Sequence, residues 1–356
     1  MKTGWTAMEK RQLVIFGLVA FALPYLLGIL MGIGYYGGSD VSVFPSAQMY
    51  YPAAGVMLAL LLTRREDSTL PRKFYFCFLA LTALMALCAV ASVLVPALPW
   101  AFISNAILMA GTLISWVFYF LDGKARHTAW GMRLNRWVFA VFALFIVLYF
   151  ARLALLTGVT VLLDPALAAA EESNAGMGGM YFAIMLLNLP LSFFLAYTAF
   201  FGEEYGWRGF LQPLLQKRFG LRGGIVVLGV AWGLWHLPIN IFFYSPDTWG
   251  LSVLNQVALC ICYSVFFGFA YMKTRSIWAP VLIHFFNNNA ITLFTDPSAI
   301  QNQVLDWTSV LLGMVVLAVL YLPFFASKVF RSGPVVELPF PTEAQPTEAA
   351  QPETAE

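Results

Sequence analysis

Two glutamates and an arginine interrupt an otherwise apolar part of the sequence. Between Glu172 and Lys217 the only charged residues are Glu203, Glu204 and Arg208. A charge in the hydrocarbon core of a bilayer costs about 2.5 to 3.5 kcal/mol on insertion scales, so three of them need partners or a wet pocket. On a helix, Glu204 and Arg208 are four residues apart and can pair, whereas Glu203 projects about 100° away. The spacing predicts one glutamate held in an ion pair and one free for chemistry.

Two of the three histidines lie in other apolar stretches of the chain. His236 is followed four residues later by Asn240, and His284 is followed at the same spacing by Asn288. Each feature alone has a simpler explanation. A histidine in an apolar stretch is more often a core residue whose hydrogen bonds are satisfied, and glutamates near the end of a span can extend to the membrane interface. Taken together on three helices, these groups are suited to activating a water molecule and stabilising an oxyanion.

The depth of these residues decides whether they can meet. Counting 1.5 Å per residue from the expected inner helix ends, His236 lies roughly 21 Å deep and Asn288 about 18 Å deep. Glu203 reaches the same layer only if its helix stays in the membrane almost to Lys217. We therefore expect this helix to continue through Gly209 or beyond inside the membrane.

The composition defines the kind of chain that must position these residues. Of 356 residues, 60% are hydrophobic and 11% are charged, against about 25% charged residues in a soluble domain. This excludes a water-soluble globule and predicts an all-α fold, a polytopic transmembrane bundle of about ten spans. The expected spans are residues 13–36, 47–63, 74–96, 99–121, 137–157, 184–216, 223–242, 251–272, 277–295 and 308–327.

The basic residues predict the orientation of the chain in the membrane. With the N-terminus in the cytoplasm, every Lys and Arg except Arg152 falls in an inner segment, as the positive-inside rule requires. We therefore expect a multi-pass protein of the cell membrane with both termini cytoplasmic and the lipid bilayer as its surroundings. A net charge of +2 without a basic patch gives no reason to expect nucleic acid as a partner.

The polar motifs resemble those of a known protein family. In order and spacing they are similar to the motifs of the CAAX prenyl endopeptidase and bacteriocin-processing (CPBP, or Abi) family of intramembrane proteases. The resemblance covers about residues 180 to 300, and Trp232 stands where the family usually has Phe. The motifs are Glu203-Glu204-x-x-x-Arg208, Trp232-x-x-x-His236 and His284-x-x-x-Asn288.

The resemblance implies an endopeptidase that acts on a membrane-associated or lipidated peptide or protein. It implies that Glu203 polarises a water molecule with help from His236, that His284 and Asn288 steady the oxyanion, and that Glu204 and Arg208 hold their helix in register. Because the family is often labelled a metalloprotease, Glu203, His236 and His284 form a candidate zinc set. Hydrogen bonding around a glutamate-activated water is an equal alternative.

Composition, together with the resemblance over about residues 180 to 300, suggests how the chain is divided. Residues 1–157 are expected to form N-terminal transmembrane helices, and residues 158–178 an acidic outer loop rich in Gly and Ala. Residues 179–331 are expected to form the CPBP-like core. Residues 332–356, rich in Pro, Glu, Ala and Thr, are expected to be a disordered cytoplasmic tail.

Two other functions compete with proteolysis. A non-catalytic membrane protein could use the same fold to regulate another envelope protein, although every motif position is intact. An ion-coupled carrier could use acidic and histidine residues as a proton relay. The sequence shows no duplicated halves of the kind many carriers have, which counts against that second alternative.

Overall fold

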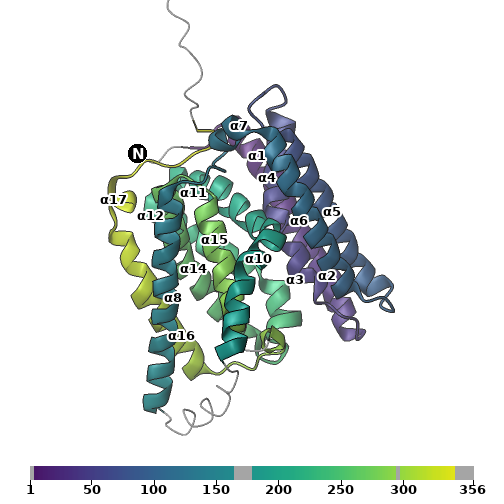
Figure 1. Ribbon diagram of the computed structural model, residues 1–356, viewed down its shortest axis with the longest axis vertical. Helices are drawn as coiled ribbons and strands as arrows, with labels where there is room; N and C mark the ends of the chain where they lie inside the picture. The colour runs from purple at the N-terminus through teal and green to yellow at the C-terminus, as the bar shows by residue number, and fades with distance from the viewer. Residues whose placement is uncertain (1–3, 164–178, 294–296, 341–356) are drawn as a thin grey trace, which may run out of the picture.

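The protein is a bundle of helices that run mainly along one direction (Figure 1). The structure, a computed structural model, describes residues 4–163, 179–293 and 297–340. Within these ranges every regular element is a helix and no β-strand occurs. The predicted all-α membrane bundle is confirmed.

The N-terminal helices form one side of the bundle, where α5 and α6 lie along each other (Figure 1). Their first two helices, α1 and α2, are joined by a π-helical turn, η1, into one long rod. The bounds are α1 Ala7–Gly17, η1 Leu18–Ala22, α2 Leu23–Tyr36, α3 Val43–Gln48, α4 Tyr51–Thr63, α5 Arg72–Leu94, α6 Trp100–Asp122 and α7 Lys124–Ala129.

The remaining helices form the other side and carry all the candidate site residues. The bounds are α8 Arg136–Leu163, α10 Gly179–Glu204, η2 Tyr205–Leu211, α11 Gln212–Phe219, α12 Leu221–Trp235, α13 Leu237–Ile239, η3 Asn240–Tyr244, η4 Pro246–Thr248, α14 Trp249–Thr274, α15 Trp278–Asn289, η5 Ala290–Leu293, η6 Pro297–Ile300, α16 Trp307–Tyr321, η7 Leu322–Ala326 and α17 Lys328–Ser332. Helix α8, which falls mostly within the expected N-terminal helices of residues 1–157, packs against α14, α15 and α16.

Fewer helices are long enough to cross a membrane than the sequence suggests. Among the described residues seven qualify, or eight if a pair bent by 41° counts as one span. The expected spans at residues 47–63 and 277–295 contain helices of only 13 and 12 residues, α4 and α15. Both are apolar because most of their residues are buried inside the bundle, and hydropathy does not distinguish burial in protein from contact with lipid.

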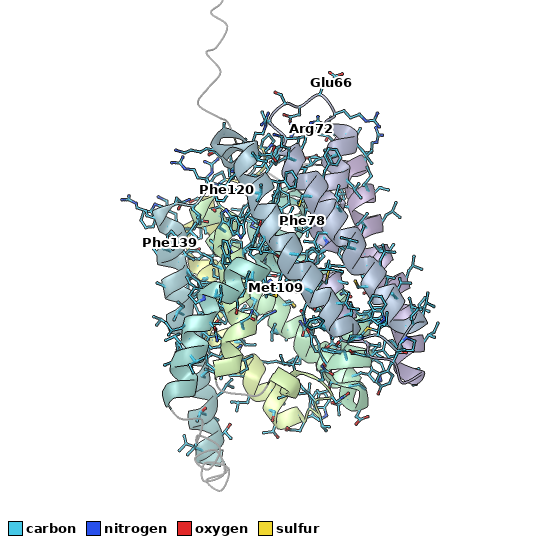
Figure 2. The ribbon with its side chains drawn as sticks, turned by 45° about the vertical axis from the view of Figure 1, so that its right-hand side comes forward. Glu66, Arg72, Phe78, Met109, Phe120 and Phe139 are labelled. Atoms are coloured by element: carbon cyan, nitrogen blue, oxygen red, sulfur yellow. The ribbon has the colours of Figure 1, made fainter. Side chains whose placement is uncertain are left out.

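The qualifying helices cover the outside of the bundle with apolar side chains. Phe120 and Phe139 are 71% and 57% exposed, whereas Phe78 on the inner side of α5 is fully buried (Figure 2). A soluble monomer rarely exposes so much contiguous apolar surface. The chain is therefore a multi-pass membrane protein. The qualifying spans are Ala7–Tyr36, Arg72–Leu94, Trp100–Asp122, Arg136–Leu162, Leu186–Phe219, Pro246–Thr274 and Trp307–Ala326.

One end of the bundle gathers the basic loops. Arg126 Nε donates to Ser68 O at 3.1 Å, and Asn135 Nδ2 donates to Thr274 O at 2.9 Å, so loops that are far apart in sequence meet there. Figure 2 shows Arg72 at the same end.

The chain continues to pack beyond the point where disorder was expected. Phe340 N donates to Ala129 O at 2.6 Å, and the Arg275 guanidinium lies 4.6 Å from the Phe340 ring centre. The expected start of the disordered tail at residue 332 is therefore wrong for residues 332–340, since apolar side chains such as Val336 anchor them. The rest of the tail lies outside the described residues.

The outer loop expected at residues 158–178 begins later than predicted, because α8 continues to Leu163. Residues 164–178 of this loop lie outside the described residues.

Candidate active site

The helix that carries the glutamates continues deep into the bundle. Helix α10 ends at Glu204 and is extended by the π-helical segment η2 and by α11, so that one span of 34 residues reaches Phe219. The predicted continuation of the helix through Gly209 is confirmed, and its position inside the membrane stays a prediction. Wider π-helical turns inside long helices are frequent at functional sites. Here the turn begins directly after the two carboxylates.

Small residues let this helix approach its neighbours closely. A Cβ atom at Gly202 would collide with the Met49 carbonyl oxygen, and one at Gly206 would collide with Pro52. The helix that carries the glutamates therefore packs closely, through its glycine face, against the segment joining α3 to α4 and the start of α4. Gly202 and Gly206 are four residues apart, so both lie on the helix face that makes this close approach.

Glu204 is the glutamate that is held in place. Its carboxylate pairs with Arg208 Nη1 at 3.0 Å, as the spacing predicts, and its Oε1 accepts a hydrogen bond of 2.8 Å from His284 Nδ1. The Arg208 guanidinium lies 4.3 Å from the Trp232 ring centre and 4.8 Å from that of Phe267. A buried arginine can be stabilised by such stacking. These charges lie fully inside the protein.

Glu203 has one oxygen held and one oxygen available. Oε2 accepts hydrogen bonds from Trp232 Nε1 at 2.7 Å and from Trp207 Nε1 at 3.2 Å. An indole N–H only donates, so both tryptophans hold this oxygen as an acceptor. No group among the described residues hydrogen-bonds Oε1, and the Glu203 side chain is buried, with 2% exposed.

His236 lies where its span breaks. The expected span at residues 223–242 is bent by 41° between α12 and the segment that follows His236. Its Nδ1 is 2.8 Å from the Trp232 carbonyl oxygen. Because a carbonyl only accepts, Nδ1 carries the proton and Nε2 holds the lone pair of the neutral ring. Asn240 does not reach the ring, since its Nδ2 donates to His236 O at 2.9 Å and its Oδ1 accepts from Ser252.

Trp232 joins the parts of the site. Its indole contacts Glu203 by the hydrogen bond above, and its ring centre lies 6.1 Å from that of His236 and 5.6 Å from that of His284. Side chains from α10, from the junction of α12 and α13 and from α15 therefore meet around one indole. The hydrogen bonds of Trp207 and Trp232 to Glu203 were not predicted from the sequence. The four-residue spacing of Glu203 and Trp207 was the available signal.

Asn288 lies further out than the other site residues. It is one turn beyond His284 on the same face of α15 and is exposed. Its Oδ1 accepts a hydrogen bond of 3.0 Å from Asn287 Nδ2, and it makes no hydrogen bond to Glu203, Glu204 or His236 in the described structure.

The side chains do not fit a metal ion. Within the described ranges, no three His, Cys, Asp or Glu side chains lie close enough together to hold one. His284 Nδ1 is engaged by Glu204, and one oxygen of Glu203 is engaged by two indoles. The candidate zinc set of Glu203, His236 and His284 is thus not assembled in the described structure.

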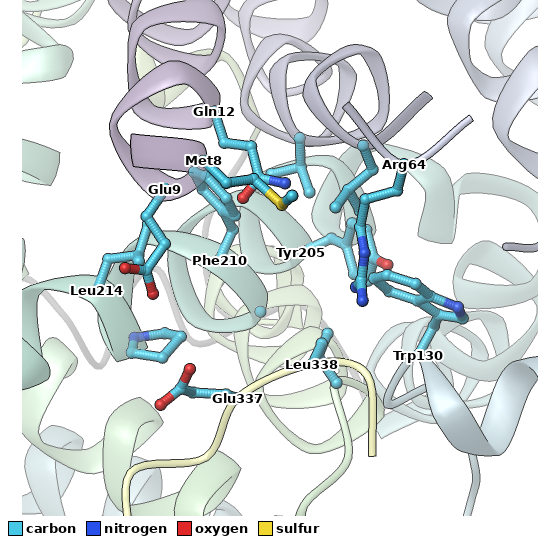
Figure 3. A pocket seen from close by; sticks show the side chains of 14 residues that line it. Met8, Glu9, Gln12, Arg64, Trp130, Tyr205, Phe210, Leu214, Glu337 and Leu338 are labelled. Carbon is cyan, nitrogen blue, oxygen red and sulfur yellow. The ribbon is translucent and has the colours of Figure 1, made fainter. Parts of the chain in front are cut away.

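A separate cavity, shown from close by in Figure 3, has Arg64 and Trp130 in its wall. Its volume is about 140 Å³, and Tyr205 and Gly209 of η2 line it together with Glu337 and Leu338 of the C-terminal segment. None of the six candidate site residues lines it. It is therefore distinct from the Glu203 site.

Fold and site together define a multi-pass helical membrane protein with buried glutamate and histidine side chains at the centre of its C-terminal helices. Residues 179–290 match the family model described as type II CAAX prenyl endopeptidase Rce1-like, which supports membership of the CPBP family. This segment contains every candidate site residue. The resemblance recognised from the motifs is confirmed.

One curated relative is similar to part of the chain. It is the CAAX prenyl protease 2 of Methanococcus maripaludis, with 30% identity over 127 residues. The similar region covers 33% of this chain and 46% of the relative, so the chain spans about half of that protein's length. No solved structure matches the chain.

Proposed function

We propose that the chain is an intramembrane endopeptidase that hydrolyses a peptide bond of a membrane-associated or lipidated substrate. One observation carries the proposal: Glu203 keeps a free carboxylate oxygen while Trp207 and Trp232 hold the other. The similarity to a protein named CAAX prenyl protease 2 supports a prenylated peptide as the substrate.

In the proposed reaction, Glu203 and His236 activate the attacking water. Glu203 Oε1 and the Nε2 lone pair of His236 are the two acceptors left free by their hydrogen bonds. The water oxygen bonds to the peptide carbonyl carbon while its proton passes to one of these acceptors. The same proton then moves to the leaving amine as the C–N bond breaks. General base catalysis of this kind contributes about 10² to 10⁴ in rate.

His284 and Asn288 are the proposed groups that stabilise the oxyanion. His284 donates its Nδ1 proton to Glu204, so its Nε2 can donate to an oxyanion only when the ring is doubly protonated. The Asn288 amide is a donor in every protonation state. Asn288 is therefore the proposed principal donor, with His284 as the second.

We also propose that both termini face the cytoplasm of a cell membrane. The support is the gathering of basic loops at one end of the bundle, where Arg126 and Asn135 join loops distant in sequence. Such segments face the cytoplasm under the positive-inside rule.

The test is cleavage of a farnesylated peptide ending in a CAAX sequence by the purified protein in liposomes. Glu203→Gln should lower the rate about 10² to 10⁴-fold and leave the melting temperature unchanged. Glu66→Gln, an equivalent change at an exposed loop position (Figure 2), should retain full activity. Cleavage at the normal rate by Glu203→Gln would contradict the mechanism. Inactivity of the wild-type protein would favour the non-catalytic alternative.

A further inference from the structure

Arg152 is a cation without a carboxylate partner in the outer half of α8. It lies 16 residues after Arg136, the first residue of that helix, or roughly 24 Å along it. Among the described residues no Asp or Glu lies within ion-pair distance of its side chain. An arginine at such a depth is costly and normally has a functional reason.

A chain of hydrogen bonds leads from Arg152 to the end of α15. Arg152 Nη1 donates to Tyr263 OH at 2.5 Å, and Tyr263 OH donates to Asn287 Oδ1 at 2.6 Å. Asn287 Nδ2 then donates to Asn288 Oδ1 at 3.0 Å. The arginine is thus connected, through one tyrosine and one amide, to the proposed oxyanion donor.

The chemistry of its first member fixes the direction of this chain. A guanidinium has no acceptor, so the Tyr263 oxygen must receive the hydrogen bond and turn its own proton toward Asn287. Asn287 accepts through its oxygen and therefore presents its NH₂ group to Asn288. Asn288 in turn uses its oxygen to accept and keeps its NH₂ group free. Each link sets the orientation of the next.

Resting on the proposed function, we propose that Arg152, Tyr263 and Asn287 are positioning residues that keep the Asn288 amide turned with its donor toward the oxyanion. An amide turned the other way would present its oxygen to the developing negative charge. Removing one oxyanion donor costs about 10² to 10³ in rate, so its orientation matters for catalysis.

Packing keeps the middle of the chain rigid. The Tyr263 side chain is 1% exposed, and its ring centre lies 5.2 Å from that of Tyr321 and 5.6 Å from that of Phe267. Phe267 also contacts His284, at 5.9 Å between ring centres. The hydroxyl of Tyr263 is therefore held in place from the side of the active site.

A double-mutant cycle on cleavage of the farnesylated peptide tests this chain. Tyr263→Phe should lower kcat about tenfold with little change in KM, because the Asn288 amide would be less well oriented and would lose part of its stabilisation of the oxyanion. Tyr321→Phe removes a neighbouring hydroxyl that has no hydrogen-bond partner in the described structure, and it should stay within about twofold of wild type. In the Asn288→Ala background, Tyr263→Phe should cause no further loss.

The outcomes separate the inference from the proposed function. A normal kcat in Tyr263→Phe would overturn the positioning chain. An equal loss of kcat from Tyr263→Phe in the wild-type and Asn288→Ala backgrounds would overturn it as well. Neither result would contradict the proposed endopeptidase function. Absence of cleavage by the wild-type protein would overturn both. If Tyr263→Phe fails to fold, Asn287→Asp is the second variant, because an aspartate can accept from Tyr263 but has no NH₂ group to donate to Asn288. The kcat of Asn287→Asp should also fall about tenfold. A normal kcat in this variant would contradict the proposal.

Discussion

The Glu204 carboxylate and the His284 imidazole are joined by a hydrogen bond of 2.8 Å between Oε1 and Nδ1. This bond connects α10 to α15 across the centre of the bundle. Arg208 binds the same carboxylate from one turn further along the chain. Glu204 therefore holds the arginine and orients the histidine ring, which leaves Nε2 of His284 as the only ring nitrogen available to a substrate.

The Glu204–Arg208 pair should be essential for stability. Arg208→Met leaves the fully buried Glu204 without its cation, which we expect to destabilise the fold by about 3 to 5 kcal/mol. Unfolding of the purified protein in detergent, followed by the loss of helical circular dichroism, measures the effect. A melting temperature equal to that of the wild type would show that the pair contributes little.

Removing both charges supplies the control for that measurement. Glu204→Gln combined with Arg208→Met leaves no unpaired buried ion. The double variant should therefore lose less free energy of unfolding than the two single variants lose in sum. Simple additivity would mean that the two side chains do not interact energetically.

His236 and Asn240 should have different roles despite their shared spacing. His236→Gln should lower kcat about 10² to 10⁴-fold at an unchanged melting temperature, because the Nε2 base is lost. Asn240→Ala should instead lower stability by about 1 to 3 kcal/mol, because the His236 carbonyl and the Ser252 hydroxyl lose their partner. Cleavage kinetics and melting curves of both variants check this. If Asn240→Ala lost as much activity as His236→Gln without any loss of stability, the proposed difference in their roles would be contradicted.

The sequence predicted the parts of the site that depend on periodicity. The ion pair of Glu204 with Arg208 and the continuation of their helix beyond Gly209 follow from helical spacing and from depth counting. Both depend only on residues within one helix. The composition was likewise sufficient to predict the helical membrane fold.

Features that depend on contacts between helices could not be read in the same way. The Trp232 indole reaches Glu203 across 29 positions of sequence, and no periodic pattern reports such a contact. The short helices α4 and α15 looked like spans because burial in protein requires the same apolar residues as exposure to lipid. The packing of Val336 and Phe340 was hidden by the polar composition around them.

Close packing of α12 against α14 should depend on two glycines. A Cβ atom at Gly229 would lie 2.5 Å from Ile261 Cα, and one at Gly233 would lie 2.5 Å from Val257 Cα. Gly229→Ala forces the helices apart, and we expect it to destabilise the protein by about 1 to 3 kcal/mol. Melting temperatures in detergent report the change.

Gly313→Ala is the matched control for this substitution. It lies in α16 with no atom within 4 Å of the added Cβ. Since alanine is the better helix former by up to about 1 kcal/mol, this variant should melt at or slightly above the wild-type temperature. An equal decrease in the melting temperature of both variants would indicate a general effect of replacing glycine. It would contradict the proposed dependence on the contact between α12 and α14.

The pH dependence of stability should reveal His127, which lies outside the membrane-spanning segments. Its ring stacks on Tyr119 at 3.7 Å, and its buried Nε2 has no hydrogen-bond partner in the described structure. Burial lowers the pKa of His127, although Asp122 nearby acts in the opposite direction and Arg126 adds to the lowering. The folded state therefore favours the neutral ring.

The sign of the effect follows from that shift. In the unfolded chain the pKa of a histidine is about 6.5, so below this pH the unfolded state binds a proton that the folded state does not. The contribution of His127 to stability is present above about pH 6.5 and is lost as the pH falls toward the lowered folded pKa. Melting temperatures measured from pH 7.5 to pH 5 should fall less in His127→Phe, which keeps the ring stacking but cannot be protonated. The same decrease in both proteins would assign the pH dependence to other groups.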